Sequence, residues 1–136
     1  YHYKIFNHSI PPAIHHQYIW FIRKRLNIHA MRVAITHIIG RHDFKAFEGS
    51  GSPRAHTIRH VIAAEILETE SGQIRFQIEA DGFLRYMVRN IVGTLVDVGL
   101  SKLSTDDFKQ ILDSSDRTNA SATAPAHGLY LMEVKY

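Results

Sequence analysis

The sequence of 136 residues contains no cysteine. Disulfide frameworks, thiol nucleophiles and cysteine-ligated metal centres are therefore excluded, and a reducing compartment, by default the cytosol, is expected. The sequence also lacks a run of the ~20 apolar residues that a membrane-spanning helix needs. The stretch from Ile91 to Val98, for example, is interrupted by Gly93, Thr94 and Asp97. A transmembrane protein is therefore excluded.

The sequence begins at Tyr1 rather than at a Met, and its first residues show no signal-peptide pattern. We therefore expect this chain to be a piece of a longer protein. The composition, with 45% hydrophobic residues and a net charge of +3, is that of an ordinary globular domain and excludes disorder. A chain of this length buries roughly 65–70% of its unfolded surface on folding, so it needs no metal or disulfide to fold. We expect a single domain over residues 1–136.

Positive charge is concentrated in the first 60 residues, which hold nine of the lysines and arginines, nine of the ten histidines and two acidic residues. The remainder of the chain is net acidic. A polyanion such as RNA suits the basic half. A solvated charged face is the alternative that this asymmetry alone leaves open.

Hydrophobic periodicity and turn residues predict the secondary structure. The predicted strands cover residues 1–6, 18–22, 57–68, 73–80 and 129–134. The predicted helices cover residues 28–39, 83–99 and 105–113, with Asn27 as an N-cap and Gly40 as a C-terminal stop. Between them, residues 41–47 are expected to be irregular, residues 48–53 to form a flexible loop, and Ser71-Gly72 to form a tight hairpin turn.

The order strand, helix, hairpin, helix, helix, strand predicts an α+β fold with a mainly antiparallel sheet and helices on one face. A ferredoxin-like arrangement is our first choice. Residues 73–80 support it, because Ile74, Phe76 and Ile78 alternate with polar residues, as in a sheet with one covered face.

The predicted helix at residues 83–99 has an apolar stripe and a polar stripe. The polar stripe places Arg85 and Arg89 four residues apart, next to the end of a strand, where a phosphate or a partner carboxylate could bind. A surface pair bound to Glu79 or Asp81 is an equal alternative on the residues alone.

Other chemistries find little support in the sequence. His56 and His60 are four residues apart on a predicted strand, but no HExxH motif or carboxylate set accompanies them, so we expect no metal. A Gly-x-Ser-x-Gly nucleophile motif and a phosphate-binding glycine loop are also missing.

Tyr1 and Tyr3 could stack on a base or pack inside the sheet. The aromatic sequence motif of an RRM is absent, which disfavours that kind of RNA-binding domain.

Four segments in this order strongly resemble the C-terminal domain of the tRNA pseudouridine synthase family TruA. The segments are Tyr1-His2-Tyr3, Gly40-Arg41-His42-Asp43-Phe44-Lys45-Ala46-Phe47, Gly82-Phe83-Leu84-Arg85-Tyr86-Met87-Val88-Arg89-Asn90-Ile91-Val92-Gly93-Thr94-Leu95, and Asp116-Arg117 through Thr123-Ala124-Pro125-Ala126-His127-Gly128-Leu129-Tyr130-Leu131. The resemblance spans essentially the whole chain.

The resemblance implies an enzyme that isomerises uridine to pseudouridine at nucleotides 38, 39 and 40 of the tRNA anticodon stem-loop. It also implies that no cofactor is used, that the protein is a homodimer, and that each subunit has two ferredoxin-like halves around a basic cleft. The catalytic aspartate belongs to an Arg-Thr-Asp-x-Gly-Val-His motif of the N-terminal half, which this chain lacks. We therefore expect the chain to be inactive alone and to need the N-terminal domain as a partner.

By position, Tyr1 resembles the tyrosine that stacks on the flipped uracil, and Arg89 resembles the arginine that pairs with the missing aspartate. A cation within ~4–6 Å keeps a carboxylate ionised, as a nucleophile requires. Phe83 and Leu131 would shape the uracil pocket, and Arg85 would bind substrate beside them. The residues expected to meet tRNA phosphates are Arg23, Lys24, Arg25, Arg54 and Arg59.

Two alternatives to an enzyme domain remain at this stage. One is a free-standing RNA-binding module without catalysis. The other is a protein-interaction domain that does not bind RNA.

Overall fold

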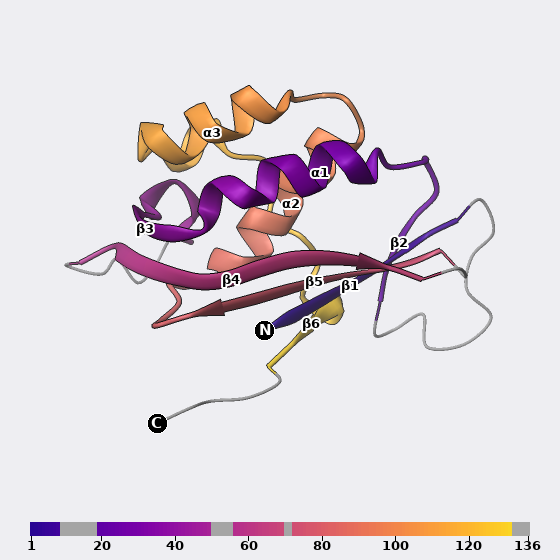
Figure 1. Cartoon of the computed structure of the whole chain (residues 1–136), viewed down its shortest axis with the longest axis horizontal. Coiled ribbons are helices and arrows are strands. Elements are labelled where there is room, and N and C mark those ends of the chain that lie inside the picture. Colours follow the sequence, from indigo (N-terminus) through magenta and orange to yellow (C-terminus); the bar gives the residue numbers. More distant parts are fainter. Residues whose placement is uncertain (9–18, 50–55, 70–71, 132–136) are drawn as a thin grey trace.

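The structure, a computed structural model, describes residues 1–8, 19–49, 56–69 and 72–131. A sheet forms one layer and three helices form a second layer on one of its faces (Figure 1). The strands are β1 (His2–Asn7), β2 (Trp20–Ile22), β3 (Gly40–Asp43), β4 (Ile58–Glu68), β5 (Gln73–Ala80) and β6 (Leu129–Tyr130). The helices are α1 (Ile28–Ile35), α2 (Met87–Gly99) and α3 (Thr105–Ser114), and short 3-10 helices cover Thr36–Ile38, Lys45–Phe47, Arg117–Asn119 and Ala126–Gly128.

The strands lie in the order β2-β1-β5-β4-β3, and the short strand β6 pairs with the N-terminal end of β1. Among the described strands, β1 and β2 pair in parallel and the other pairs are antiparallel. These findings confirm the expected α+β fold with a mainly antiparallel sheet, helices on one face and a ferredoxin-like arrangement. They also confirm the hairpin of β4 and β5.

The core lies between the sheet and the helices, where the sequence pattern predicted it. Ile74, Phe76 and Ile78 of β5 are at most 3% exposed, and they face the apolar side of α2. Burying side chains of this size stabilises a fold by about 1.5–3 kcal/mol each.

The predicted N-cap Asn27 is confirmed, because its side chain accepts a hydrogen bond from the Ala30 N–H. Helix α3 begins at Thr105 as predicted, and Ser104 and Asp107 form a reciprocal capping box there, which the sequence analysis did not predict. Each cap satisfies backbone N–H groups that the first helical turn leaves without a partner.

The region around Gly40 differs from the prediction. Helix α1 ends at Ile35 and continues only as a 3-10 turn, so the predicted helix over 28–39 was too long. Gly40 has φ 102°, a backbone conformation that suits glycine, and it begins strand β3 rather than ending a helix. Residues 40–43 are therefore a strand, not the irregular segment predicted for 41–47, and they pair with β4.

Helix α2 begins at Met87, four residues later than predicted. Tyr86 adopts φ 59°, which is left-handed and stops a helix from extending through residues 83–86. Arg85 therefore lies outside the helix, and the expectation that Arg85 and Arg89 share one helical face was wrong.

The polar stripe of α2 is not a solvated face. The segment from Arg117 to Ala124 covers it and buries Asn90 and Thr94 completely. The Asn90 amide donates to the Phe47 carbonyl and accepts from the Thr123 hydroxyl. The residues of this stripe are polar because they form hydrogen bonds with a distant segment of the chain.

Three predictions lie outside the described residues. They are the turn residue Ser71, most of the loop over 48–53, and the end of the closing strand beyond Leu131. In the described ranges, no helix is both long enough and apolar enough to cross a membrane.

Candidate functional site

A pocket with a volume of about 570 Å³ opens beside the start of α2. Its lining comes from three segments that are distant in the sequence: the start of β1, the turn and first residues of α2, and the region around β6. The lining residues are Tyr1, Phe83, Leu84, Arg85, Tyr86, Met87, Val88, Arg89, Ala126 and Leu129. The structure thus brings together four of the predicted site residues: Tyr1, Phe83, Arg85 and Arg89.

The backbone of β5 fixes Tyr1 at the pocket. Tyr1 exchanges two backbone hydrogen bonds of 3.0 Å with Ile78, one as donor and one as acceptor. The Tyr1 ring meets the Phe83 ring edge to face, with the ring centroids 4.9 Å apart. Because edge-to-face pairs are a favourable aromatic geometry, the two rings stabilise each other as one wall of the pocket.

A backbone carbonyl fixes Arg89. The Nε of Arg89 donates to the Ala124 carbonyl at 2.8 Å, and the Arg89 carbonyl accepts from the Ala124 N–H. Gly93, one turn further along α2, lets the two segments approach this closely, because a Cβ there would lie 2.1 Å from the Ala122 carbonyl oxygen. The position of Arg89 therefore depends on the loop that covers α2.

Tyr86 joins the two arginines of the pocket. The guanidinium carbon of Arg85 lies 4.7 Å from the centre of the Tyr86 ring, and that of Arg89 lies 4.8 Å from it. Arg85 also donates to the Tyr86 hydroxyl at 3.1 Å. This hydrogen bond, together with the positive charge of both arginines, lowers the pKa of Tyr86. The sequence analysis assigned Tyr86 to a helix and did not identify its contacts with both arginines.

Tyr3 is buried and is not available for stacking on a base. Its hydroxyl donates to the Pro125 carbonyl, and burial raises its pKa, against the smaller opposing effect of Arg89. Of the two alternatives for Tyr3, packing inside the sheet is therefore the one observed.

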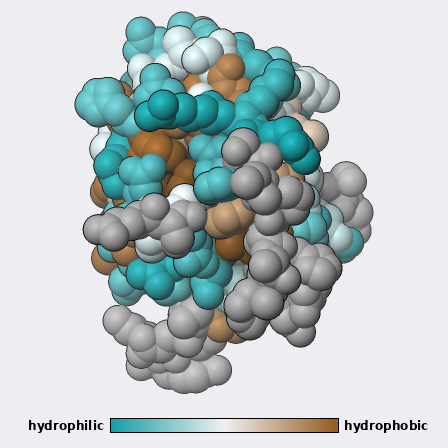
Figure 2. Space-filling view, turned by 90° about the vertical axis from the view of Figure 1, so that its right-hand side faces the viewer, coloured by the Kyte–Doolittle hydropathy of each residue, from teal (hydrophilic) through white to brown (hydrophobic). Residues whose placement is uncertain are grey.

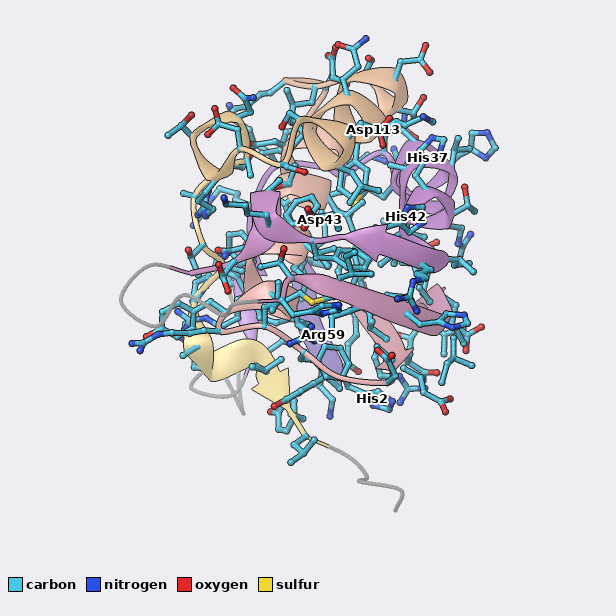
Figure 3. All side chains as sticks on the ribbon, turned by 90° about the vertical axis from the view of Figure 1, so that its left-hand side faces the viewer. His2, His37, His42, Asp43, Arg59 and Asp113 are labelled. Carbon is cyan, nitrogen blue, oxygen red and sulfur yellow. The ribbon has the colours of Figure 1, made fainter. Side chains whose placement is uncertain are left out.

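Arg59 lies near the pocket but outside its lining. Its guanidinium donates to the carbonyls of His56 and Ile58, and its Nε lies 3.3 Å from where a Cβ on Gly82 would be. Figure 3 shows Arg59 on the sheet. It therefore flanks the turn that carries Phe83.

Arg23, Lys24 and Arg25 are exposed at the other end of β1, away from Tyr1. The Asn7 side chain holds this segment, because it donates to the carbonyls of Ile22 and Lys24 and accepts from the Leu26 N–H. Arg23 and Arg25 line a second pocket of about 790 Å³ with the start of α1 and the end of α2. Figure 2 views the molecule from the end where β2 lies, and shows mainly hydrophilic residues with a smaller apolar area between them.

Two other predicted residues are not part of the first pocket. Leu131 lies two residues after the lining residue Leu129 and is 57% exposed. Arg54 lies outside the described residues. Their roles stay predictions.

The histidines in the described ranges form no metal-binding cluster with acidic residues. Figure 3 shows His2 apart from His37 and His42. The His42 ring nitrogen bonds to the Ile39 carbonyl at 2.9 Å. Within the described ranges there is no group of three or more His, Asp or Glu side chains that could hold a metal ion.

The first pocket combines the contacts that a flat, anionic ligand needs. Leu84, Met87 and Val88 are buried apolar residues of its lining, and Tyr1 and Phe83 are its aromatic residues. Arg85 and Arg89 add positive charge on one side. Such a pocket suits a nucleobase that stacks on a ring while arginines bind a phosphate or a carboxylate.

Aromatic walls beside arginines are features of a nucleotide-binding pocket, and comparison with known sequences identifies the family. Residues 34–136 match the model of a family described as tRNA pseudouridine synthase. The chain therefore belongs to the tRNA pseudouridine synthase family.

Curated relatives extend this similarity over all 136 residues. The chain is 40% identical to a tRNA pseudouridine synthase A of Pseudothermotoga lettingae and covers 56% of that protein. It is 41% identical to one of Acetivibrio thermocellus and 46% identical to one of Thermoanaerobacter sp. strain X514, and it covers 55% of each. The chain thus spans about half the length of the curated relatives it matches.

Proposed function

We propose that this chain is the C-terminal half of a tRNA pseudouridine synthase, which isomerises uridine to pseudouridine at positions 38, 39 and 40 of the anticodon stem-loop. The observation that carries the proposal is the pocket in which Tyr1, Phe83, Arg85 and Arg89 meet from distant segments. Family membership and the similarity of all 136 residues to part of tRNA pseudouridine synthase A support it.

In the proposed site, the aspartate that attacks the substrate belongs to the other half of the protein. The terminal nitrogens of Arg89 would pair with that aspartate and keep it ionised at neutral pH, since an adjacent cation lowers a carboxyl pKa. The Nε of Arg89 is already bonded to the Ala124 carbonyl, which orients the guanidinium for such a pair. A planar guanidinium can bind both carboxylate oxygens at once.

Tyr1 would stack on the target uracil after it leaves the helical stack of the RNA, and would assist removal of the proton from C5. Extruding a base costs a few kcal/mol, and stacking on an aromatic ring returns roughly 1–3 kcal/mol of it. The edge-to-face contact with Phe83 supports this role, because it fixes the Tyr1 ring in advance. Leu131 and Phe83 would shape the uracil pocket.

Affinity for tRNA would come mainly from cations along the chain. Arg85 and Arg59 lie at or next to the pocket and would contact the backbone near the target nucleotide. The remaining predicted contacts are the exposed cluster Arg23, Lys24 and Arg25, together with Arg54. Phosphate contacts of this kind weaken as salt rises and carry little sequence information.

The proposal includes the partners of the domain. They are the tRNA anticodon stem-loop, the N-terminal domain of the same protein and a second subunit in a homodimer. The reaction would take place in the cytoplasm without a cofactor.

The test is an assay of pseudouridine formation on an unmodified tRNA transcript. The chain is compared with the longer protein obtained by restoring the sequence that precedes Tyr1 in its gene. Activity only in the longer protein is the expected result. Activity of the chain alone would contradict the assignment of the aspartate to the other half, and tRNA binding without activity in either protein would favour an RNA-binding module.

A further inference from the structure

Tyr86 is an exposed aromatic residue in a backbone conformation that aromatic residues rarely adopt. Its φ of 59° and ψ of 10° are left-handed, and its side chain is 42% exposed. A bulky residue pays a steric cost in this region, so such a position persists only where the surroundings impose it. The strained residue lies in the lining of the candidate pocket, which is where functional strain is expected.

The surroundings that impose this conformation come from Gly49. The Gly49 N–H donates to the Arg85 carbonyl at 2.7 Å, and a Cβ on Gly49 would lie 2.5 Å from Cδ2 of the Tyr86 ring. On the other side, the Tyr86 carbonyl accepts from the Asn90 N–H at 2.8 Å, which begins α2. The Tyr86 ring therefore packs against the backbone of Gly49, and hydrogen bonds hold the backbone carbonyls of Arg85 and Tyr86.

This turn places two arginines against the Tyr86 ring. The guanidinium carbons of Arg85 and Arg89 lie 4.7 and 4.8 Å from the Tyr86 ring centre, well within the range of cation–π attraction. Two cations repel each other, and the ring offers both a favourable contact that offsets this repulsion.

Arg89 is restrained by two contacts of different kinds. The Ala124 carbonyl binds its Nε, and the Tyr86 ring lies against its guanidinium. In the described part of the chain, its two terminal nitrogens make no hydrogen bond. Those nitrogens are the donors that a bidentate pair with a carboxylate uses.

We propose that Tyr86 is a positioning residue, whose ring holds Arg89 ready for the carboxylate of the other half and Arg85 ready for the RNA backbone. This inference rests on the proposed function of the pocket and adds a residue to it. The Tyr86 hydroxyl accepts its hydrogen bond from Arg85, so its own proton can be donated outward to a phosphate oxygen. The lowered pKa of Tyr86 fits this environment, which stabilises negative charge at the same place.

The test uses the longer protein with the sequence preceding Tyr1 restored, and measures kcat and KM for an unmodified tRNA transcript. Tyr86→Asn removes the ring, while asparagine tolerates the left-handed backbone. Tyr86→Phe keeps the ring and removes only the hydroxyl. We expect the Asn variant to lose about tenfold or more in kcat, because a catalytic group displaced by ~1 Å costs up to about 10²-fold. We expect the Phe variant to keep kcat within about twofold and to raise KM, since an exposed hydrogen bond is lost.

A double-mutant cycle separates positioning from a general structural effect. If Tyr86 acts through Arg89, Tyr86→Asn changes kcat by less than about twofold when Arg89 is already replaced by lysine. Equal losses in the presence and absence of Arg89, equal losses in the Phe and Asn variants, or an unchanged kcat in the Asn variant would overturn the inference. If the Asn variant fails to fold, Tyr86→Gly replaces it with the same expectations, because glycine adopts the backbone angle without strain.

The two proposals fail in different ways. A wild-type protein that forms no pseudouridine refutes the proposed function, and the role of Tyr86 falls with it. An active wild-type protein with an equally active Tyr86→Asn variant refutes the role of Tyr86 alone.

Discussion

Replacing Gly93 by alanine tests the close approach on which the pocket depends. Gly93 lies in the middle of α2, where glycine is a poor helix former, so helix propensity alone predicts that alanine stabilises the protein by about 1 kcal/mol. The structure predicts the opposite. An alanine Cβ would lie 2.1 Å from the Ala122 carbonyl oxygen and 3.3 Å from the Ala124 nitrogen, and both are backbone atoms that cannot rotate away.

The size of the effect follows from the contacts that must yield. Helix and loop must separate by about 1 Å, a distance that weakens at least three hydrogen bonds between them. They join the Ala124 N–H to the Arg89 carbonyl, the Thr123 hydroxyl to Asn90, and the Ser121 N–H to the Thr94 hydroxyl. At about 1 kcal/mol each, less the gain in helix propensity, the net loss is about 2 kcal/mol. A domain of this size then melts about 6 °C lower.

The measurement is thermal and urea denaturation followed by circular dichroism, with Gly99→Ala as the matched control. Gly99, the last residue of α2, is also closely packed, but a Cβ there would meet the flexible side chain of Met31, with the sulfur at 2.5 Å. The Gly99 variant should therefore lose less stability than the Gly93 variant. A Gly93→Ala protein as stable as the wild type, or more stable, would refute the reasoning.

Three further predictions concern the site, the RNA contacts and pH. In the longer protein, Tyr1→Phe should retain far more activity in the pseudouridine assay than Tyr1→Ala, and equal losses would mean that stacking is not what Tyr1 contributes. Reversing the charge of Arg23, Lys24 and Arg25 should lower tRNA affinity and reduce the slope of log affinity against log salt by about 2, whereas unchanged binding in a filter assay would place the RNA elsewhere. The pKa of Tyr3 is raised by burial, so stability should hold below its unfolded value of 10.0 and fall as pH rises beyond it. Urea denaturation between pH 8 and 11 should show this fall in the wild type and lose it in Tyr3→Phe.

The elements that could be predicted from sequence are those with a local cause. Strand β5 follows from alternation, its hairpin with β4 follows from the turn between them, and α3 begins at the predicted Thr105. Strand β3 was missed because it has four residues and gains its hydrogen bonds from β4 rather than from its own composition. Local patterns carry no information about such a distant partner.

The same distinction applies to the pocket. The resemblance selected Tyr1, Phe83 and Arg89, the helical pattern selected Arg85, and the structure brings these four together. Tyr86 was missed, because a left-handed aromatic residue has no signal in the sequence and results from contacts with Gly49 and α2.

Burial of the polar stripe of α2 was also unpredictable from the helix alone. Asn90 and Thr94 look like surface residues until the segment that ends at Ala124 is placed over them. The same segment supplies the carbonyl that orients Arg89. A loop that is distant in the sequence thus determines where Arg89 lies in the site.

Arg89 is proposed to keep a carboxylate of the other half ionised. The most direct measurement is the single-turnover rate of pseudouridine formation against pH, in the longer protein and in its Arg89→Ala variant. Losing an adjacent cation raises a carboxyl pKa by about 1–3 units. We expect a variant that is slower than the wild type throughout and loses proportionally more rate at pH 5 than at pH 8. A near-normal rate with an unchanged pH profile would contradict it.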